Sequence, residues 1–379
     1  MVYLDNAATT FPKSERVYQA MDSANRNLAV NAGRGSYKLA REATRLIEET
    51  KEKIKELINA DMDAMVVFSP SITVAMNQII QGIMWKKDAV IYVSPYEHNA
   101  VARTLNYLKK REIIVLKEIP IDTTTLEIDT ERMRYMFSKD IPSAVFCTHV
   151  SNVTGYILPV KEIFEEAKKY NCITILDSAQ SLGLVDVNCK KLDVDIITFT
   201  GHKCLYGPLG IGGFINISGV PIKEYIVGGT GSDSLNLDMP QIGSEKFEAA
   251  SSNIVAIKGL NAALEEANVN AIYAKEKKLT DYLITQLEAI SQIRLFLPGN
   301  RERHIGIVSF TVDGYYSEDV GNILDEDFDI AVRTGYHCAP YIHRYLGDKE
   351  SLGTVRVGIG QFNCEEDVDK LIQALKDLF

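Results

Sequence analysis

The chain has 379 residues, a formal net charge of −10, 46% hydrophobic residues and 24% charged residues. This is the composition of a soluble globular protein, and the length suits two domains better than one core. The acidic balance argues against a nucleic-acid or anionic-membrane partner, although it does not exclude a local basic pocket for a phosphate.

The N-terminal stretch and the cysteines indicate the compartment. The first residues contain neither a basic region nor a long apolar run, so we expect no signal peptide, and no apolar run reaches the length of a membrane span. Six cysteines are scattered along the chain without a CxxC pair, and a chain of this length does not need disulfide bonds. We therefore expect reduced thiols in a cytoplasmic protein without a metal site.

Apolar strands alternate with helices through the first half of the chain. The first long helix is predicted over 38–58, where apolar residues fall mostly on one helical face. The predicted strands are Ala64–Ser69, Ala89–Ser94, Ile113–Lys117, Ala144–Val150, Ile173–Asp177, Asp195–Thr200 and Gly212–Ile217. The helices predicted between them are Thr73–Met84, Asn99–Lys110, Thr130–Phe137 and Val160–Tyr170. This alternation predicts an α/β fold with a mostly parallel sheet that binds its ligands beyond the carboxyl ends of the strands.

The pattern changes after residue 217. Residues 218–250 are rich in Gly, Ser and Asp, which predicts a long functional loop or a subunit contact. The elements predicted after it are helices at Ile254–Ala267, Ile272–Ile290, Ser317–Leu324 and Glu365–Leu378, and strands near Ile305–Val312 and Thr354–Gly358. We expect a large domain over 13–255 and a smaller α+β domain over 256–379. Residues 1–12 are expected to belong to the smaller domain.

Lys203 is the first candidate for chemistry, because it follows an apolar strand and precedes a glycine-rich turn. A lysine held between buried strands must lose its proton or find a partner, since burial of a bare ammonium is costly. A neutral lysine amine attacks aldehydes, and pyridoxal phosphate (PLP) is the aldehyde that lysines most often hold. The alternative is a strand-end lysine whose head reaches water.

Three further residues suit a flat cofactor. Asp177 ends an apolar strand, where its carboxylate could keep a pyridine nitrogen protonated; the alternative is a helix cap. Gln180 follows three residues later and could bond the ring hydroxyl oxygen. His98 follows another strand and could stack on the ring and handle protons, whereas the alternative is a hydrogen-bonded structural histidine.

Residues 71–73, Ser-Ile-Thr, open a helix after a strand. Hydroxyls and free backbone N–H groups at a helix start form an anion site that suits a phosphate, although simple capping explains them as well. Thr200 and His202 lie close to Lys203 in the sequence and could also bond a phosphate.

Cys338 lies among glycine, polar residues and proline in the segment 333–340, which predicts a loop. A loop thiol near cations can be partly ionised, and the thiolate is the reactive form; otherwise a lone cysteine is usually a small buried hydrophobe. His337 is adjacent, but neighbours in an extended loop point in opposite directions, so we do not assume a Cys–His pair. Arg356 is predicted in a buried strand, where it needs a carboxylate partner that is either structural or part of a substrate.

These residues resemble those of class V, fold-type I PLP enzymes, and within them the SufS-like cysteine desulfurases, a group that includes selenocysteine lyases. The resemblance runs from Tyr3 to Glu366. Its most specific pieces are Glu97-His98-Asn99-Ala100, Val150-Ser151-Asn152-Val153-Thr154-Gly155, Asp177-Ser178-Ala179-Gln180, Gly201-His202-Lys203 and Arg333-Thr334-Gly335-Tyr336-His337-Cys338-Ala339. It implies a large PLP-binding domain with a mostly parallel seven-stranded sheet and a smaller α+β domain.

The resemblance also implies a role for each candidate. The cofactor residues would be Lys203 as the attachment point, His98 stacked on the ring, Asp177 at the pyridine nitrogen, Gln180 at the ring hydroxyl, Asn152 beside the ring, and Ile72, Thr73, Thr200 and His202 at the phosphate. Ser251 from the second subunit of a homodimer would complete the phosphate site. Asn152, Arg333 and Arg356 would bind the substrate, and Cys338 would accept its sulfur as a persulfide.

The implied reaction converts L-cysteine to L-alanine and passes the sulfur to an acceptor thiol, which can belong to another protein, as in iron–sulfur cluster assembly. The alternatives are a selenocysteine lyase, or an aminotransferase or racemase that shares Lys203 and Asp177 without using Cys338. A non-enzymatic alternative is an inactive homologue that serves as a scaffold in sulfur trafficking. A nicotinamide enzyme is a weaker alternative, since no GxGxxG motif follows the first strand.

Several positions depart from the group. Thr200 stands where the group often has serine and Ser251 where it often has threonine, so both keep a hydroxyl. Tyr37 falls where SufS-like enzymes carry a histidine, a change that could alter substrate positioning. The segment 341–352 does not match closely enough to carry roles.

Overall fold

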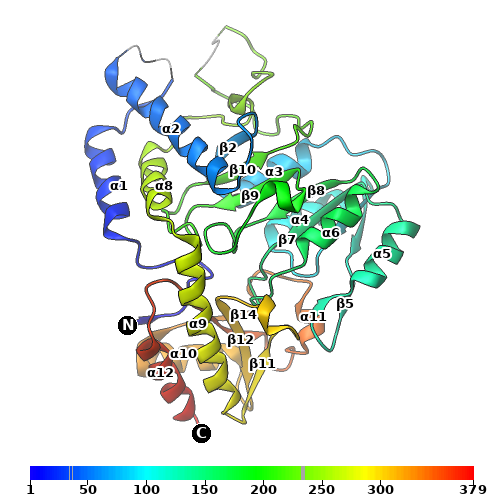
Figure 1. The fold of residues 1–379 in the computed structure, drawn as a ribbon, viewed down its shortest axis with the longest axis vertical. Helices are drawn as coiled ribbons and strands as arrows, with labels where there is room; N and C mark the ends of the chain where they lie inside the picture. The colour runs from blue at the N-terminus through cyan, green and yellow to red at the C-terminus, as the bar shows by residue number, and fades with distance from the viewer. Residues whose placement is uncertain (34, 36, 232–234) are drawn as a thin grey trace.

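The computed structural model describes residues 1–33, 35, 37–231 and 235–379 (Figure 1). Its largest sheet has seven strands in the order β2-β10-β9-β8-β7-β3-β4. Their bounds are β2 Met65–Ser69, β3 Ala89–Val93, β4 Ile114–Glu118, β7 Ala144–Thr148, β8 Ile173–Asp177, β9 Ile196–Thr200 and β10 Gly212–Asn216. Only β10 runs antiparallel to its neighbours within this sheet. The prediction of a mostly parallel seven-stranded sheet is therefore confirmed, with strand ends that differ by one or two residues.

Helices cover both faces of this sheet, because neighbouring residues of each strand point to opposite faces. The helices around the sheet are α1 Glu15–Asn27, α2 Lys38–Leu57, α3 Ile72–Gly82, α4 Asn99–Lys109, α5 Thr130–Lys139, α6 Val160–Lys168, α7 Cys189–Leu192 and α8 Ile254–Glu266. Val67 packs in the apolar layer beneath α3 and α4, whereas its neighbours Val66 and Phe68 belong to the layer that includes α2, α5, α6 and α8. The strands thus read as continuous apolar runs because both faces are buried.

A second sheet, antiparallel throughout, lies at the other end of the molecule (Figure 1). Its strands are β11 Ile293–Phe296, β12 Ile307–Val312, β15 Thr354–Gly358 and β14 Arg333–Gly335, in that order across the sheet. Its helices are α9 Val269–Glu288, α10 Ser317–Phe328, α11 His343–Leu346 and α12 Glu365–Lys376. Short ladders join β1 Val2–Tyr3 to β13 Ile330–Ala331, and β5 Ile121–Asp122 to β6 Glu127–Ile128. The first residues of the chain therefore pair with a segment beside the second sheet.

The structure adds elements that the sequence pattern does not reveal. One of them is helix α1, in which only Val17 and Ala24 are buried. The prediction that 333–340 is entirely a loop is wrong at its start, since 333–335 form β14 and pair with β15. In the described part of 218–250 the regular element is a short 3-10 turn, Ser244–Lys246, and residues 232–234 lie outside the described residues. The division into 13–255 and 256–379 with 1–12 stays a prediction.

No helix within the described ranges is long and apolar enough to cross a membrane.

A buried polar clamp joins the two sheets. Tyr206, which follows the large-sheet strand β9, donates a hydrogen bond of 2.9 Å from its hydroxyl to Glu276 Oε1 on α9. The same hydroxyl accepts a bond of 2.6 Å from the backbone N–H of Gln361, which follows β15. Burial raises the pKa of the Glu276 carboxyl from 4.5 to about 8, so this carboxyl is largely protonated at neutral pH in the folded protein.

The Glu276→Gln substitution is expected to stabilise the protein selectively at alkaline pH. Because the folded-state pKa exceeds the unfolded one, the contribution of Glu276 to stability is complete below about pH 4.5 and is lost as the pH rises towards 8. Glutamine keeps an acceptor for Tyr206 and cannot ionise. The free energy of unfolding of the variant relative to wild type should rise by roughly 3 kcal/mol between pH 5.5 and 8, measured by denaturant titration. If the difference in free energy of unfolding between the variant and wild type is the same at pH 5.5 and pH 8, the raised pKa of Glu276 is contradicted.

Candidate active site

The candidate residues gather where parallel strands of the large sheet end. His98 follows β3, Asn152 follows β7, Asp177 is the last residue of β8, and Lys203 follows β9. These strands are parallel, so their carboxyl ends meet at one edge. The four side chains therefore come together because of topology, although they are spread over more than a hundred residues of sequence.

Lys203 occupies a tight turn at this edge. Its carbonyl accepts bonds from the Tyr206 N–H and the Thr10 hydroxyl, while its Nζ makes no hydrogen bond or ion pair with any residue that the structure describes. Burial lowers the pKa of the Lys203 ammonium, and the carboxylate of Asp177 offsets part of this effect. An amine with a lowered pKa and no partner is suited to nucleophilic attack and to proton transfer.

Asp177 is fully buried, and its Oδ1 accepts a 2.9 Å bond from the Ala179 N–H. No helix begins at Asp177 in the described structure, so its alternative role as a helix cap is wrong. Burial raises the pKa of the Asp177 carboxyl, against the opposing effects of the Ala179 N–H and Lys203. A buried acid of this kind can hold a cationic nitrogen through an ion pair.

His98 is the N-cap of α4, and its Nδ1 accepts a 3.1 Å bond from the Ala100 N–H. That bond assigns the ring proton to Nε2. Burial, followed by the charges of Lys203 and Arg333, lowers the pKa of His98 to about 3. The imidazole is thus neutral across the physiological range, which suits stacking on a flat ring better than acting as a base.

The residues predicted for a phosphate lie around the start of α3. Ser71 caps this helix by accepting a bond from the Val74 N–H, so the capping alternative is confirmed for Ser71. At Gly212, a Cβ would lie 3.3 Å from Ile72 N and 3.4 Å from Thr200 Cα, so these backbones approach closely only because residue 212 is glycine. The Nδ1 atom of His202 is buried without a hydrogen-bond partner. Burial lowers the pKa of His202 to about 4.

Other predicted residues are bonded elsewhere or stand apart. The Gln180 amide donates a 2.7 Å bond to the carbonyl of Ala7. Thr73 and Ser251 are exposed, and Ser251 lines a separate pocket with Ser69 and Gly210. Tyr37 is 52% exposed and precedes α2 without capping it. Within one chain, therefore, Ser251 and Tyr37 are not brought against Lys203 by any contact that the structure describes.

Cys338 lies in a tight turn that directly follows β14. The Ala339 N–H bonds the Tyr336 carbonyl at 3.1 Å, and the central residues His337 and Cys338 have φ of 45° and 58°, as in a type I′ turn. The Arg333 guanidinium donates to Cys338 Sγ at 3.6 Å. This is the cationic neighbour that a reactive thiolate needs.

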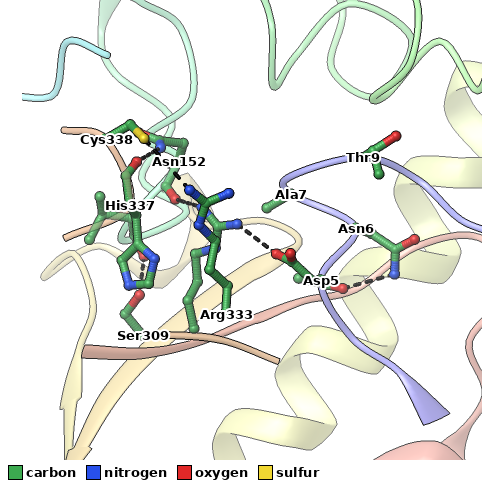
Figure 2. Close-up of polar contacts among 12 residues, drawn as sticks. Asp5, Asn6, Ala7, Thr9, Asn152, Ser309, Arg333, His337 and Cys338 are labelled. Carbon is green, nitrogen blue, oxygen red and sulfur yellow. Dashed lines mark hydrogen bonds and ion pairs between the residues drawn. The ribbon is translucent and has the colours of Figure 1, made fainter. Parts of the chain in front are cut away.

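Neighbouring side chains hold this turn in place. His337 Nε2 lies 2.8 Å from Thr354 Oγ1, and the positive φ of His337 shows that this segment is a turn rather than the extended loop assumed from the sequence. The Asn152 amide donates to the His337 carbonyl at 2.6 Å, and the Asn99 N–H donates to the Cys338 carbonyl at 2.7 Å. Figure 2 shows Asn152, His337 and Cys338 side by side.

Arg356 is 1% exposed and is held by two parts of the chain outside its own strand. Its Nη1 donates to the Asn152 carbonyl at 2.9 Å, and its Nη2 pairs with Asp5 Oδ1 at 2.8 Å. The sequence leaves open which carboxylate pairs with Arg356. In the structure the partner is Asp5, which contacts the guanidinium through Oδ1. Arg356 Nε remains buried without a partner and is available to a further acceptor.

An open cleft of about 950 Å³ borders Cys338. Four basic side chains line it: Arg103, Arg333, Arg344 and Lys349. The cleft gives the thiol a route to the exterior in an otherwise acidic protein.

Sequence reasoning assigns no role to two residues that shape the site. Asp5 lies in the motif that begins the resemblance, but its pairing with Arg356 spans nearly the whole chain. Glu97 is fully buried and its Oε1 accepts bonds from Ser94 Oγ and Thr148 N, which ties β3 to β7. Burial, then repulsion by Asp177, raises the pKa of Glu97 to about 8. The sequence signal that could have indicated a role for Glu97 is its position next to His98.

Comparisons with known proteins agree with this arrangement. The model of the family described as Aminotransferase class-V matches residues 2–371. A probable cysteine desulfurase from Methanothermobacter thermautotrophicus is 31% identical over 389 residues, which cover 100% of this chain and 94% of the relative. The cysteine desulfurase of Escherichia coli strain SE11 is 30% identical and covers 99% of this chain and 93% of its own length.

The chain belongs to the class-V aminotransferase family.

Solved structures agree with this class-V assignment. The apo structure of a cysteine desulfurase from Thermococcus onnurineus has a TM-score of 0.91 at 31% identity and covers 100% of this chain and 94% of its own. The Escherichia coli cysteine desulfurase CsdA, in its S-sulfonic acid form, has a TM-score of 0.86 at 25% identity, with coverage of 99% and 94%. The fold-type I architecture expected from the sequence is thus confirmed.

Class-V enzymes use PLP, and the residues present fit that group. Three features match three parts of the cofactor: the Lys203 amine matches the aldehyde, the buried Asp177 carboxyl matches the pyridine nitrogen, and His202 Nδ1, which is buried without a partner, matches the phosphate. Ile72 is the first residue of α3, and the backbone N–H groups at the start of a helix can bind an anion such as the phosphate. These residues would hold PLP, with Thr200 beside the phosphate.

The Gly212→Ala substitution tests the phosphate end of this class-V site. The new Cβ would lie 2.8 Å from Phe199 O and 3.3 Å from Ile72 N, so the backbones must separate. We expect the PLP dissociation constant to rise about tenfold or more, equivalent to about 1.4 kcal/mol, in an absorbance titration of the cofactor-free protein. Gly229→Ala is the control, because a Cβ there meets nothing within 4 Å. Equal affinities in the two variants would contradict the proposed phosphate position.

Proposed function

We propose that the chain is a PLP-dependent cysteine desulfurase, which converts L-cysteine to L-alanine and passes the sulfur through Cys338. The observation that carries the proposal is the placement of Cys338 on an anchored turn, with its thiol contacting Arg333 in the lining of the cleft. An aminotransferase or racemase has no need for such a thiol, whereas a sulfur acceptor needs it held in one place. Membership of the family and the names of the relatives support the same reaction.

The cofactor, when bound, supplies an aldehyde that takes up the substrate amine and a ring that accepts electrons from the substrate carbons. The chain supplies the rest. Lys203 Nζ would attach the cofactor and then, once released, accept the α-proton of the substrate, because burial keeps this amine in its neutral form more readily than a surface lysine. Asp177 would hold the pyridine nitrogen in its protonated state, and His98 would stack on the ring as a neutral imidazole.

The arginines would fix the other end of the substrate. Arg356 has a buried Nε without a partner, and Asp5 and Asn152 already orient its guanidinium. A substrate carboxylate bound there would sit beside the Asn152 loop and near the turn of Cys338. Such positioning accounts for much of the rate in reactions that join two bound groups.

Sulfur transfer then follows from the placement of the thiol. Arg333 contacts Cys338 Sγ, and the thiolate of Cys338 would attack the sulfur of bound cysteine. A Cys338 S–S bond forms while the substrate Cβ–S bond breaks, and the bonding electrons remain on carbon, which gains a proton and becomes the methyl group of alanine. An acceptor thiol, entering through the basic cleft, would remove the sulfur from Cys338.

Cys338→Ala is expected to lower alanine and sulfide production from L-cysteine by about 100-fold or more while PLP stays bound, since the variant lacks only the sulfur acceptor. Lys203→Ala should lose both the activity and the covalent attachment of PLP. Alanine and sulfide are measured together with a reducing thiol present. The matched control is Cys364→Ala, because Cys364 is an exposed thiol that precedes α12.

Other outcomes identify the alternatives. Full desulfurase activity in Cys338→Ala would remove this thiol from the mechanism. Activity with selenocysteine and none with cysteine would indicate a selenocysteine lyase. A protein that stays colourless after PLP is added would indicate an inactive scaffold. Conversion of amino acids without release of sulfide would indicate an aminotransferase or racemase.

We also propose that the active form is a homodimer in the cytoplasm. Exposed apolar side chains cluster in the segment before Ser251: Val227, Leu235, Leu237 and Ile242. Leu237 is 100% exposed, which is unusual for a large aliphatic side chain and favours burial against a second copy. In such a dimer the exposed Ser251 would complete the phosphate site of the partner.

Light scattering tests the dimer directly. We expect a mass of twice the chain's 42.2 kDa, and a shift towards the single-chain mass when Leu235 and Leu237 are both changed to Ser. Met62→Ser is the control, because Met62 is also largely exposed but lies between α2 and β2. A wild-type protein that stays monomeric at micromolar concentration would contradict the dimer.

A further inference from the structure

The turn of Cys338 is conformationally costly, so something must hold it. His337 and Cys338 both have positive φ, a region that residues with a Cβ rarely adopt because the Cβ crowds the backbone. The carbonyls of His337 and Cys338 are bonded by Asn152 and Asn99, as described above. The remaining carbonyl, that of Tyr336, closes the turn by accepting the Ala339 N–H.

A histidine from the segment 341–352 also bonds this closing carbonyl. His343, the first residue of α11, places Nε2 3.0 Å from the Tyr336 carbonyl oxygen. Its Nδ1 lies 2.5 Å from Asp348 Oδ2. The side chains of His343 and Asp348 are 6% and 1% exposed, so water cannot easily replace the bond between them. The His343 ring also meets the Tyr336 ring edge-on at 5.1 Å between centroids.

The two bonds of His343 determine where the protons lie. A carbonyl oxygen only accepts, so Nε2 must carry a proton. Asp348 Oδ2 and Nδ1 are close enough that a proton lies between them, whichever of the two atoms holds it. Asp348 therefore fixes the orientation of the imidazole, and the imidazole in turn bonds the carbonyl that closes the turn.

We propose that His343 and Asp348 are positioning residues for the sulfur-accepting thiol, and that they act through the Tyr336 carbonyl to keep Cys338 Sγ beside Arg333. The inference rests on the proposed function of Cys338. It assigns a role to the segment 341–352, for which the sequence indicates none. A purely structural pair would stabilise α11 without affecting the thiol.

Two substitutions of His343 separate these possibilities. Glutamine places an N–H donor near the position of Nε2, so His343→Gln can still bond the Tyr336 carbonyl. Asparagine reaches only the position of Nδ1, so His343→Asn loses the bond to the turn. Arg294→Gln is the control, because Arg294 bonds the Leu346 carbonyl at the end of the same helix without contacting the turn.

The first measurement needs no substrate or cofactor. Alkylation of Cys338 by iodoacetamide is followed by mass spectrometry, with the exposed Cys364 of the same molecule as the reference. We expect His343→Asn to slow the alkylation of Cys338 relative to Cys364 by about threefold or more, because the thiol moves away from Arg333. His343→Gln and Arg294→Gln should stay near the wild-type ratio.

The second measurement is steady-state desulfuration of L-cysteine by the PLP-loaded protein. His343→Asn should lower kcat about tenfold while KM for L-cysteine stays within about twofold, since a displaced acceptor affects transfer and leaves substrate binding intact. His343→Gln should recover most of the lost kcat. If wild type itself releases no sulfide, the proposed function fails, and the alkylation ratio still tests the positioning role.

Equal alkylation ratios in wild type and His343→Asn would overturn the proposal. Equal losses of kcat in His343→Asn and His343→Gln would also overturn it. If His343→Asn does not fold, Asp348→Ala replaces it. This variant keeps the His343 ring but removes the side chain that orients it. The proposal then requires a lowered ratio for Asp348→Ala, and an unchanged ratio would overturn it.

Discussion

The guanidinium of Arg356 is the point where three separate parts of this protein meet. The arginine lies in β15 of the small sheet, its Nη2 pairs with Asp5 from the N-terminal segment, and its Nη1 bonds the Asn152 carbonyl in the loop after β7 of the large sheet. Figure 2 shows Asp5 facing this cluster from the N-terminal segment. A charge buried this deeply is strongly destabilising unless it is paired, so the pairing constrains the relative positions of all three parts. The substrate end of the proposed site is built at this junction.

Burial also governs the chemistry at the edge of the large sheet. Burial shifts the pKa values of four side chains in the direction that favours their neutral forms, because each side chain is removed from water. These side chains are Lys203, Asp177, Glu97 and His98. Only Lys203 and Asp177 carry opposite charges that support each other. A cofactor with a cationic nitrogen and an anionic phosphate would supply the missing counter-charges, which accounts for polar groups that otherwise lack partners.

The turn of Cys338 follows another physical rule. Its backbone is held in a disfavoured region by hydrogen bonds to consecutive carbonyls, from Asn152, Asn99 and, through the closing carbonyl, His343. Each of these donors comes from a different element. Strain that is held from several directions is a feature of functional sites, where a side chain must be presented in one orientation. The basic cleft beside it is open to the exterior and is lined by Cys338.

The sequence by itself determined the large sheet and the candidate cofactor residues at its strand ends. The apolar runs of its strands and the helical periodicity between them are local signals, and Asp177 and Lys203 could be recognised because they end or follow such runs. The sequence did not reveal α1, whose buried face is small, or β14, whose polar residues read as a loop. Only the tertiary structure decided the partner of Arg356, the burial of Glu97 and the contact of His343 with the turn of Cys338. Asp5 and Arg356 are brought together by the packing of whole elements, and the spacing of residues along a chain carries no information about such distant contacts.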